Sequence, residues 1–196
     1  MIVIVDYGAG NLVSVKKAFD WLGQDCAITS DPAQVAAATK VVLPGVGHFT
    51  ATESLERTGL KQAIADSIGR RIPFLGICVG MQWMFAGSEE SPCTPGLSLF
   101  VAECERFVAS VKSPHVGWNQ LEVSSSSRLL RGVPAGSFVY FTHSFRAPVI
   151  DATVACCEYG GQFSAVVERD HLFGVQFHPE KSGEIGLQML RNFCEL

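Results

Sequence analysis

The sequence contains no long run of charge and no long apolar segment. Charged residues make up 17% of the chain and leave a formal net charge of -4, which does not indicate a surface for nucleic acid or for an anionic membrane. No stretch approaches the ~20 apolar residues that a membrane helix needs. The apolar start at residues 1–5 ends at Asp6 and has no basic flank, so it is too short for a signal-peptide core. We therefore expect a cytoplasmic protein whose partners are small molecules and other proteins.

Two further patterns are absent: cysteines paired at CxxC spacing, and a glycine-rich phosphate loop of the Walker type. The seven cysteines form an odd set without the spacing of metal ligands, and the histidines at 115, 143 and 171 have no ligand-like spacing with cysteines or carboxylates. Free thiols are typical of a reducing compartment. The sequence therefore predicts no metal and no cofactor, and we do not expect this chain to bind a nucleotide by itself.

The composition is that of a compact protein with a large interior. Hydrophobic residues make up 47% of the 196 residues, and no shift in composition marks a boundary, so we expect one domain over residues 1–196. In the first half, short β-branched runs alternate with amphipathic stretches, which predicts a parallel sheet covered by helices on both faces. The strands are expected at 2–5, 26–28, 40–43 and 73–77, and the helices at 12–22, 60–71 and 79–85.

The second half of the sequence has a different pattern of apolar and polar residues. Ser, Pro and Gly cluster at 88–96, which predicts a loop, and a closing helix is expected at 186–193. Between them, short apolar segments predict antiparallel or mixed strands around residues 99, 107, 121, 138–141, 154, 165–167 and 173–177. The predicted fold class is α/β: a single-domain, mixed, mostly parallel sheet flanked by helices, with an antiparallel extension.

Gly76-Ile-Cys78-Val-Gly80 lies between a predicted strand and a predicted helix, which is the setting of a nucleophile elbow. Small residues two positions before and after the nucleophile let the strand and the helix approach each other. At the start of the helix the partial positive charge favours the thiolate, and the N–H of Val79 is free to donate to an oxyanion. The alternative is a buried structural cysteine, which the flanking glycines disfavour.

A cysteine nucleophile needs a base, and the base needs a group that orients it. His178-Pro179-Glu180 follows the apolar segment 173–177, and in extended backbone two residues two positions apart point the same way. Glu180 would then accept a hydrogen bond from one imidazole nitrogen while the other nitrogen faces the sulfur. Alone, this triplet is more often a surface turn, but together with Cys78 it predicts a catalytic triad.

Pro44-Gly45-Val46-Gly47 ends another predicted parallel strand, at the edge where open α/β sheets bind their ligands. Its glycines allow a backbone N–H to turn toward a substrate. The same segment is also a common turn, and only its combination with Cys78 favours a site.

Gly76-Ile-Cys-Val-Gly-Met-Gln82 and Gly174-Val-Gln-Phe-His-Pro-Glu180 together resemble the class I (triad) glutamine amidotransferases. Further segments are similar to one branch of that family, the glutaminase subunits of imidazole glycerol phosphate synthases, which act in histidine biosynthesis. These segments are Asp6-Tyr-Gly-Ala-Gly-Asn11, Pro44-Gly-Val-Gly47, Pro114-His-Val-Gly-Trp-Asn119, Tyr140-Phe-Thr-His-Ser144 and Lys181-Ser182. The resemblance extends over residues 1–193, nearly the whole chain.

The resemblance implies a reaction and a role for each matching position. Cys78 would attack the side-chain amide of glutamine, with His178 as base and later acid and Glu180 as its orienter, to give glutamate and ammonia. The N–H groups of Val79 and of the Val46 or Gly47 region would hold the oxyanion, and Gly45 would belong to the substrate-binding positions. The positions that would hold glutamine are Gln82, Glu90, Ser144 and Phe145. Without the resemblance, we would assign Gln82 to an exposed helix face and Glu90 to a solvated loop.

The resemblance also implies a partner, a cyclase subunit of (β/α)8 fold that forms a heterodimer with this chain and receives the ammonia. The positions that match the family's subunit interface are Asn11, Trp118, Tyr140 and Lys181, although core packing explains the aromatic pair equally well. His48 departs from the family pattern, in which a smaller residue is more familiar, and we expect its side chain to face solvent.

Two other functions stay open. The chain could serve a different synthase, such as one making pyridoxal phosphate, purines or anthranilate, although residues 114–119 and Lys181-Ser182 favour the histidine pathway. It could also be a non-catalytic module of the same fold, or a cysteine hydrolase that acts on γ-glutamyl bonds by itself. The intact triad argues against the non-catalytic module.

Overall fold

The computed structural model describes residues 1–196, and a sheet of eight strands in the order β2-β1-β3-β4-β13-β12-β11-β8 forms its centre. Five neighbouring strands are parallel: β2 (Cys26–Thr29), β1 (Ile2–Val5), β3 (Lys40–Gly45), β4 (Phe74–Cys78) and β13 (Leu172–Val175). The antiparallel strands β12 (Gln162–Arg169), β11 (Thr153–Glu158) and β8 (Glu122–Val123) extend the sheet. The predicted fold class, a mostly parallel sheet with an antiparallel extension, is therefore confirmed.

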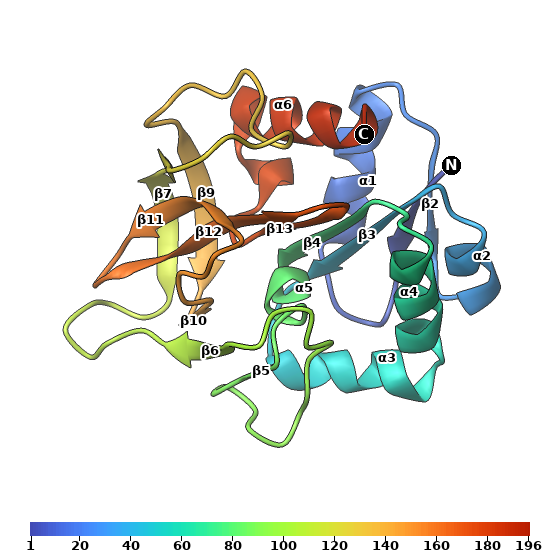
Figure 1. Cartoon of the computed structure of the whole chain (residues 1–196), viewed down its shortest axis with the longest axis horizontal. Helices are drawn as coiled ribbons and strands as arrows, with labels where there is room; N and C mark the ends of the chain where they lie inside the picture. The colour runs from blue at the N-terminus through green and yellow to red at the C-terminus, as the bar shows by residue number, and fades with distance from the viewer.

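Helices cover both faces of the parallel part (Figure 1). On one face lie α1 (Leu12–Trp21) and α6 (Gly183–Cys194), and on the other lie α2 (Pro32–Ala36), α3 (Glu53–Arg57) and α4 (Leu60–Gly69). Every residue of β1 and of β4 is buried, because the strands are covered from both sides. This explains why they read as continuous apolar runs without alternation.

Two smaller sheets complete the molecule. One pairs β7 (His115–Gln120) with β9 (Phe138–His143) in antiparallel fashion, and the other joins β5 (Gly87–Ser88), β6 (Glu103–Arg106) and β10 (Phe145–Arg146). β9 and β10 flank the single residue Ser144. The bend at this residue brings the end of β9 close to the edge of the large sheet at which β4 ends.

The order of the parallel strands determines where chemistry can occur. β4 lies between β3 and β13, and the three strands end at Cys78, Gly45 and Val175. Because the strands are parallel, the segments that follow them meet at one edge of the sheet. Residues 44–47, Cys78 and His178 therefore converge, although they are far apart in the sequence.

The helix expected at 79–85 and the strand expected near Leu99 differ from the structure for one shared reason. The helix α5 (Val79–Gln82) ends after four residues. Beyond it, the carbonyl groups at 83–85 accept hydrogen bonds from the N–H groups of residues 97–100. Residues 97–100 therefore form a loop that closes the end of α5, so the expectation of a strand around residue 99 was wrong. β7 was not expected, because Gly117 and its polar residues interrupt the apolar pattern.

None of the helices combines the length and the apolar character that crossing a membrane requires. All seven cysteines are unpaired.

The closing helix is longer than expected, since α6 begins at Gly183 rather than at residue 186.

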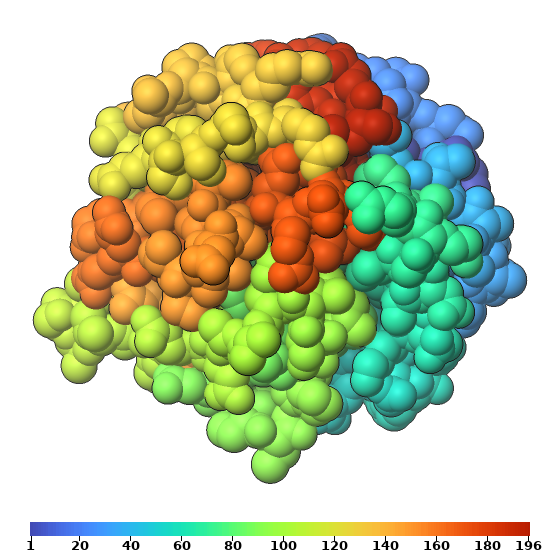
Figure 2. All heavy atoms as spheres, in the orientation of Figure 1, coloured from blue at the N-terminus to red at the C-terminus, as the bar shows by residue number.

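Residues 124–137, drawn in yellow, lie against the red helix α6 at the upper edge of the space-filling view (Figure 2). Their attachment depends on Asn192, which is 1% exposed. Its amide nitrogen donates hydrogen bonds of 2.8 Å to the carbonyl groups of Leu129 and of Arg131. A single buried side chain therefore satisfies two backbone acceptors, one in a buried bond and one in a partly buried bond.

We predict that Asn192→Ala lowers the free energy of unfolding by about 2 kcal/mol, because it leaves a buried and a partly buried carbonyl group without their donor. Arg191→Ala, on the exposed side of the same helix, should change it by less than about 0.5 kcal/mol. Chemical denaturation of both variants gives the comparison, and equal losses would contradict the assigned role of Asn192.

Candidate active site

Cys78 stands at the sharp turn between β4 and α5, with a φ of +54° and a ψ of -110°. Few residues other than glycine adopt a positive φ, and those that do are concentrated at functional sites. The side chain is 3% exposed and lines a pocket of about 110 Å³. The expected elbow is therefore present, but α5 is too short for a helix dipole to contribute much to the stabilisation of a thiolate.

Glycines on both sides of the turn allow its elements to touch. A Cβ atom added to Gly80 would lie 1.8 Å from the carbonyl oxygen of Leu43, and one added to Gly76 would lie 2.6 Å from the carbonyl oxygen of Gly80. A Cβ at Gly45 would meet the hydroxyl group of Tyr7 at 2.6 Å. Gly45 therefore lets β3 pack against the elbow, and it does not itself line the pocket.

His178 and Glu180 lie at the end of β13, where the 3-10 helix η2 (Pro179–Lys181) begins. The Nδ1 atom of His178 is 2.9 Å from Oε1 of Glu180, and both side chains are 1% exposed. The backbone N–H of His178 donates to the carbonyl group of Tyr140 at 2.9 Å, and the hydroxyl group of Ser182 donates to the His178 carbonyl at 2.7 Å. These bonds fix the imidazole ring with its Nε2 atom unbonded within the chain.

The pKa of His178 reflects its two neighbours. Burial lowers this pKa, but the sulfur of Cys78 and the carboxylate of Glu180 outweigh the burial and raise it to about 10. The imidazole of His178 therefore holds a proton at neutral pH. The geometry provides a nucleophile, a proton carrier and an orienting carboxylate in one place.

The pocket brings together most of the positions that the sequence singled out. Its lining comprises Val46, Gly47, Cys78, Val79, Gln82, Glu90, Thr142, His143, Ser144 and Phe145. Gly47 has a φ of +92°. Val79 is the first residue of α5, so its N–H has no partner within the helix. The segment after β3 and the start of α5 therefore line the same pocket as the sulfur of Cys78.

Gln82 and Glu90 are tied into the walls of the pocket. Gln82 is 2% exposed, so it does not belong to an exposed helix face, and its Nε2 atom donates to the carbonyl group of Phe145 at 2.8 Å. Glu90 accepts a hydrogen bond of 2.8 Å from the backbone N–H of Phe49. Both residues hold the pocket's loops together, and both face its interior.

Sequence reasoning gave no role to three residues at the site, Thr142, His143 and Gln176. The first two line the pocket, and the Nε2 atom of Gln176 is 3.8 Å from the sulfur of Cys78. Gln176 lies two residues before His178, and the alternation used for His178 and Glu180 would have placed it on the same side. His143 lay inside a segment that carried the family resemblance, but its spacing from other residues gave no sign of a role.

A larger hollow of about 880 Å³ lies elsewhere, between residues 123–131 and α6. Its charged groups are paired with one another: Arg128 with Glu168, and Arg131 with Glu195. Its lining includes no cysteine or histidine and no residue at positive φ. Nowhere in the chain do three or more His, Cys, Asp or Glu side chains gather in a way that could hold a metal ion.

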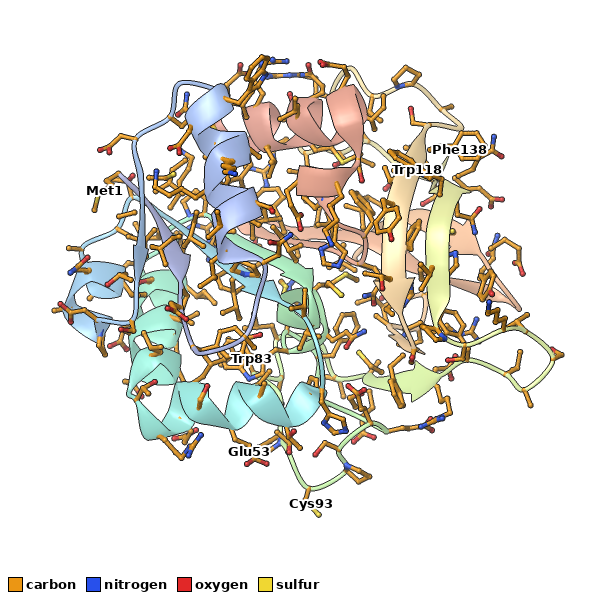
Figure 3. The ribbon with its side chains drawn as sticks, turned by 180° about the vertical axis from the view of Figure 1, so that it is seen from behind. Met1, Glu53, Trp83, Cys93, Trp118 and Phe138 are labelled. Atoms are coloured by element: carbon orange, nitrogen blue, oxygen red, sulfur yellow. The ribbon has the colours of Figure 1, made fainter.

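The four expected interface positions lie near the surface, away from the interior of the sheet. Trp118 is 55% exposed and contacts Tyr140 across the β7–β9 pair, with ring centroids 6.0 Å apart. The ammonium group of Lys181 lies 5.8 Å from the centre of the Tyr140 ring. Phe138, 51% exposed, lies beside Trp118 at the same end of the two strands (Figure 3). Core packing therefore does not explain Trp118. Asn11 is half-buried at the start of α1.

His48 is exposed, as expected. Its Nδ1 atom accepts a hydrogen bond of 3.2 Å from the backbone N–H of Thr50 and so caps the 3-10 helix η1 (Phe49–Thr52).

Known proteins resemble the chain over its whole length. A family model for glutamine amidotransferase class-I matches residues 3–196. A protein of Moorella thermoacetica named imidazole glycerol phosphate synthase subunit HisH is 46% identical, over 100% of this chain and 94% of that protein. A protein of Chlorobium luteolum with the same name is 45% identical over 100% of both. A solved structure described as a glutamine amidotransferase has a TM-score of 0.78 at 18% identity, covering 100% of this chain and 98% of that one, which is a likeness of fold.

We predict that Gly80→Ala destabilises the protein by about 3 kcal/mol or more, since the added methyl group would displace either α5 or β3. Gly69→Ala is the matched control, because no atom lies within 4 Å of the added Cβ. Gly69 ends α4, where alanine is the better helix former by about 0.5–1 kcal/mol. Thermal unfolding of the two variants should shift in opposite directions, and a shared direction would contradict the close approach at the elbow.

Proposed function

The chain belongs to the class I glutamine amidotransferase family, and we propose that it is the glutaminase subunit of an imidazole glycerol phosphate synthase, with all of residues 1–196 forming one amidotransferase domain. The observation that carries the proposal is the combination of a cysteine held at positive φ with a buried His178–Glu180 pair beside it. The names of the full-length relatives support the choice of synthase.

The first step is an attack by the thiolate of Cys78 on the side-chain amide carbon of glutamine. A carbon–sulfur bond forms, and the carbonyl oxygen takes up the negative charge. Backbone N–H groups of Val79 and of the Val46–Gly47 segment stabilise this oxyanion, with Gly45 setting the distance between β3 and the elbow. The carbon–nitrogen bond then breaks as His178 gives its proton to the departing ammonia.

The second step releases glutamate. His178, now neutral, takes a proton from a water molecule, which attacks the thioester carbon and expels the Cys78 thiolate. Glu180 keeps the imidazole in the orientation that serves both steps and stabilises its charged form. Gln82, Glu90, Ser144 and Phe145 hold the glutamine, since they line the pocket that contains the sulfur.

The partner is a cyclase subunit of (β/α)8 fold that forms a heterodimer with this chain in the cytoplasm and consumes the ammonia. The exposed Trp118 and the half-buried Tyr140, with Lys181 and Asn11, form part of the contact. Aromatic side chains of high exposure on a folded protein are typical of such contacts. A direct transfer is expected on physical grounds, because ammonia set free in water would be protonated and lost.

We predict that Cys78→Ala abolishes glutamine-dependent synthesis by the complex but preserves synthesis from added ammonia, because the cyclase needs only the product of this site. Formation of imidazole glycerol phosphate with each nitrogen source is the measurement. Loss of both activities would mean that Cys78 is mainly structural.

We also predict that the cyclase and its nucleotide substrate raise the rate of glutamine hydrolysis by at least about tenfold, since an ungated glutaminase would waste its product. Glutamate production by the isolated chain and by the complex can be compared directly. Equal rates would contradict the gating.

A further inference from the structure

A continuous chain of hydrogen bonds leads from strand β7 to the sulfur of Cys78, and the reaction described above does not use most of it. It begins at Asn119, next to the exposed Trp118, and passes through two buried histidines. It then reaches the loop between β9 and β10 and ends at the elbow. The donor and acceptor of each bond follow from its neighbours, and the two halves of the network meet at the Phe145 carbonyl, which accepts a bond from each side.

The donors and acceptors can be assigned starting from the Phe145 carbonyl group, which can only accept hydrogen bonds. His143 lies 2.8 Å from it through Nδ1, so Nδ1 carries the proton and Nε2 of the same neutral ring is an acceptor. Nδ1 of His115 lies 3.2 Å from this Nε2 and is therefore the donor. Nε2 of His115 is then an acceptor in turn, and the amide nitrogen of Asn119 approaches it at 3.4 Å. The second hydrogen of that amide goes to the Glu158 carbonyl at 3.1 Å.

The surroundings keep both histidines neutral, as this assignment requires. His115 is 4% exposed and His143 7% exposed. The ring of His115 stacks between Tyr159 and Phe141, at centroid distances of 4.0 Å and 4.8 Å. Burial lowers the pKa of His143 to about 3 and that of His115 to about 4. Neither ring is protonated at neutral pH, so the Nε2 atoms stay available as acceptors.

The half of the hydrogen-bond network nearer the pocket reaches the sulfur of Cys78. The Phe145 carbonyl accepts a second bond from Nε2 of Gln82 at 2.8 Å, and the same nitrogen donates to Oε1 of Gln176 at 3.1 Å. This arrangement turns the amide of Gln176 so that its Nε2 faces the sulfur of Cys78 at 3.8 Å. Gln176 is fully buried, so water cannot substitute for these partners.

We propose that His143 is a positioning residue. By fixing the Phe145 carbonyl it holds Gln82, and through Gln82 it holds the Gln176 amide against Cys78, where an N–H donor stabilises the thiolate. The inference rests on the proposed function and deepens it, because it assigns the control of the nucleophile's charge to residues outside the triad.

The test uses the complex with the cyclase and two variants of one residue. His143→Leu removes the donor to the Phe145 carbonyl, whereas His143→Asn keeps an N–H close to the position of Nδ1. We expect His143→Leu to lower the rate of Cys78 alkylation by iodoacetamide, mapped by mass, about tenfold. The kcat for glutamine should fall about as much, with a smaller change in KM. We expect His143→Asn to restore most of both losses.

Two further variants separate positioning from folding. His171→Leu removes another histidine bond to a carbonyl group, that of Ile68 at 2.8 Å, far from the pocket. It should change the melting temperature but neither rate. His115→Phe retains the stacking between Tyr159 and Phe141 and leaves Nε2 of His143 without its donor. Its alkylation rate and its kcat should lie between those of the wild type and those of His143→Leu. This variant keeps the proposal testable if His143→Leu does not fold.

The outcomes are distinct. Unchanged alkylation in folded His143→Leu or His115→Phe would overturn the inference, and so would an equal loss in His143→Leu and His143→Asn. A wild-type complex that does not hydrolyse glutamine would instead refute the proposed function. The alkylation rates report on the thiolate in either case, so the two failures can be told apart.

Discussion

The sulfur of Cys78 reaches the pocket because its backbone turns to a φ of +54° between β4 and α5. That turn is possible only where the neighbouring elements come closer than side chains allow, and Gly45, Gly76 and Gly80 provide the close approaches. The parallel order β3-β4-β13 then brings the segments after all three strands to the same edge. The proposed nucleophile, oxyanion donors and base therefore depend on one local backbone geometry.

Burial determines what this geometry can do. In a site where His178 and Glu180 are each 1% exposed, water screens their charges little, so the interaction between carboxylate, imidazole and sulfur is strong. The same exclusion of water keeps His115 and His143 neutral, because nothing with negative charge compensates a proton on them. The three buried histidines therefore differ in protonation, according to whether an acidic partner lies beside them. The site combines a charged pair with a neutral network, and both end at the same sulfur.

Much of this arrangement could be predicted from the sequence. The strands that carry the site were found within one or two residues, because apolar β-branched runs between glycines are a local signal. Cys78, His178 and Glu180 could be linked because each follows such a run. The roles assigned to them are proposals that the geometry supports.

The rest depended on contacts that no local pattern records. His115 and His143 are directly opposite each other in the β7–β9 pair, and the register that joins them is invisible in a strand interrupted by Gly117. Gln176 attracts no attention until its amide is seen beside Cys78. The end of α5 was misplaced since it is set by N–H groups at 97–100, well away in the chain. Sequence reasoning therefore located the strand ends and missed the side-chain network between them.

The most direct measurement of the central claim is covalent labelling of the complex with a chloroketone analogue of glutamine, followed by peptide mapping. The account predicts one adduct, on the buried Cys78, which excess glutamine prevents, while the exposed Cys93 stays unmodified. Labelling that spares Cys78, or that follows exposure and modifies Cys93 regardless of glutamine, would contradict it.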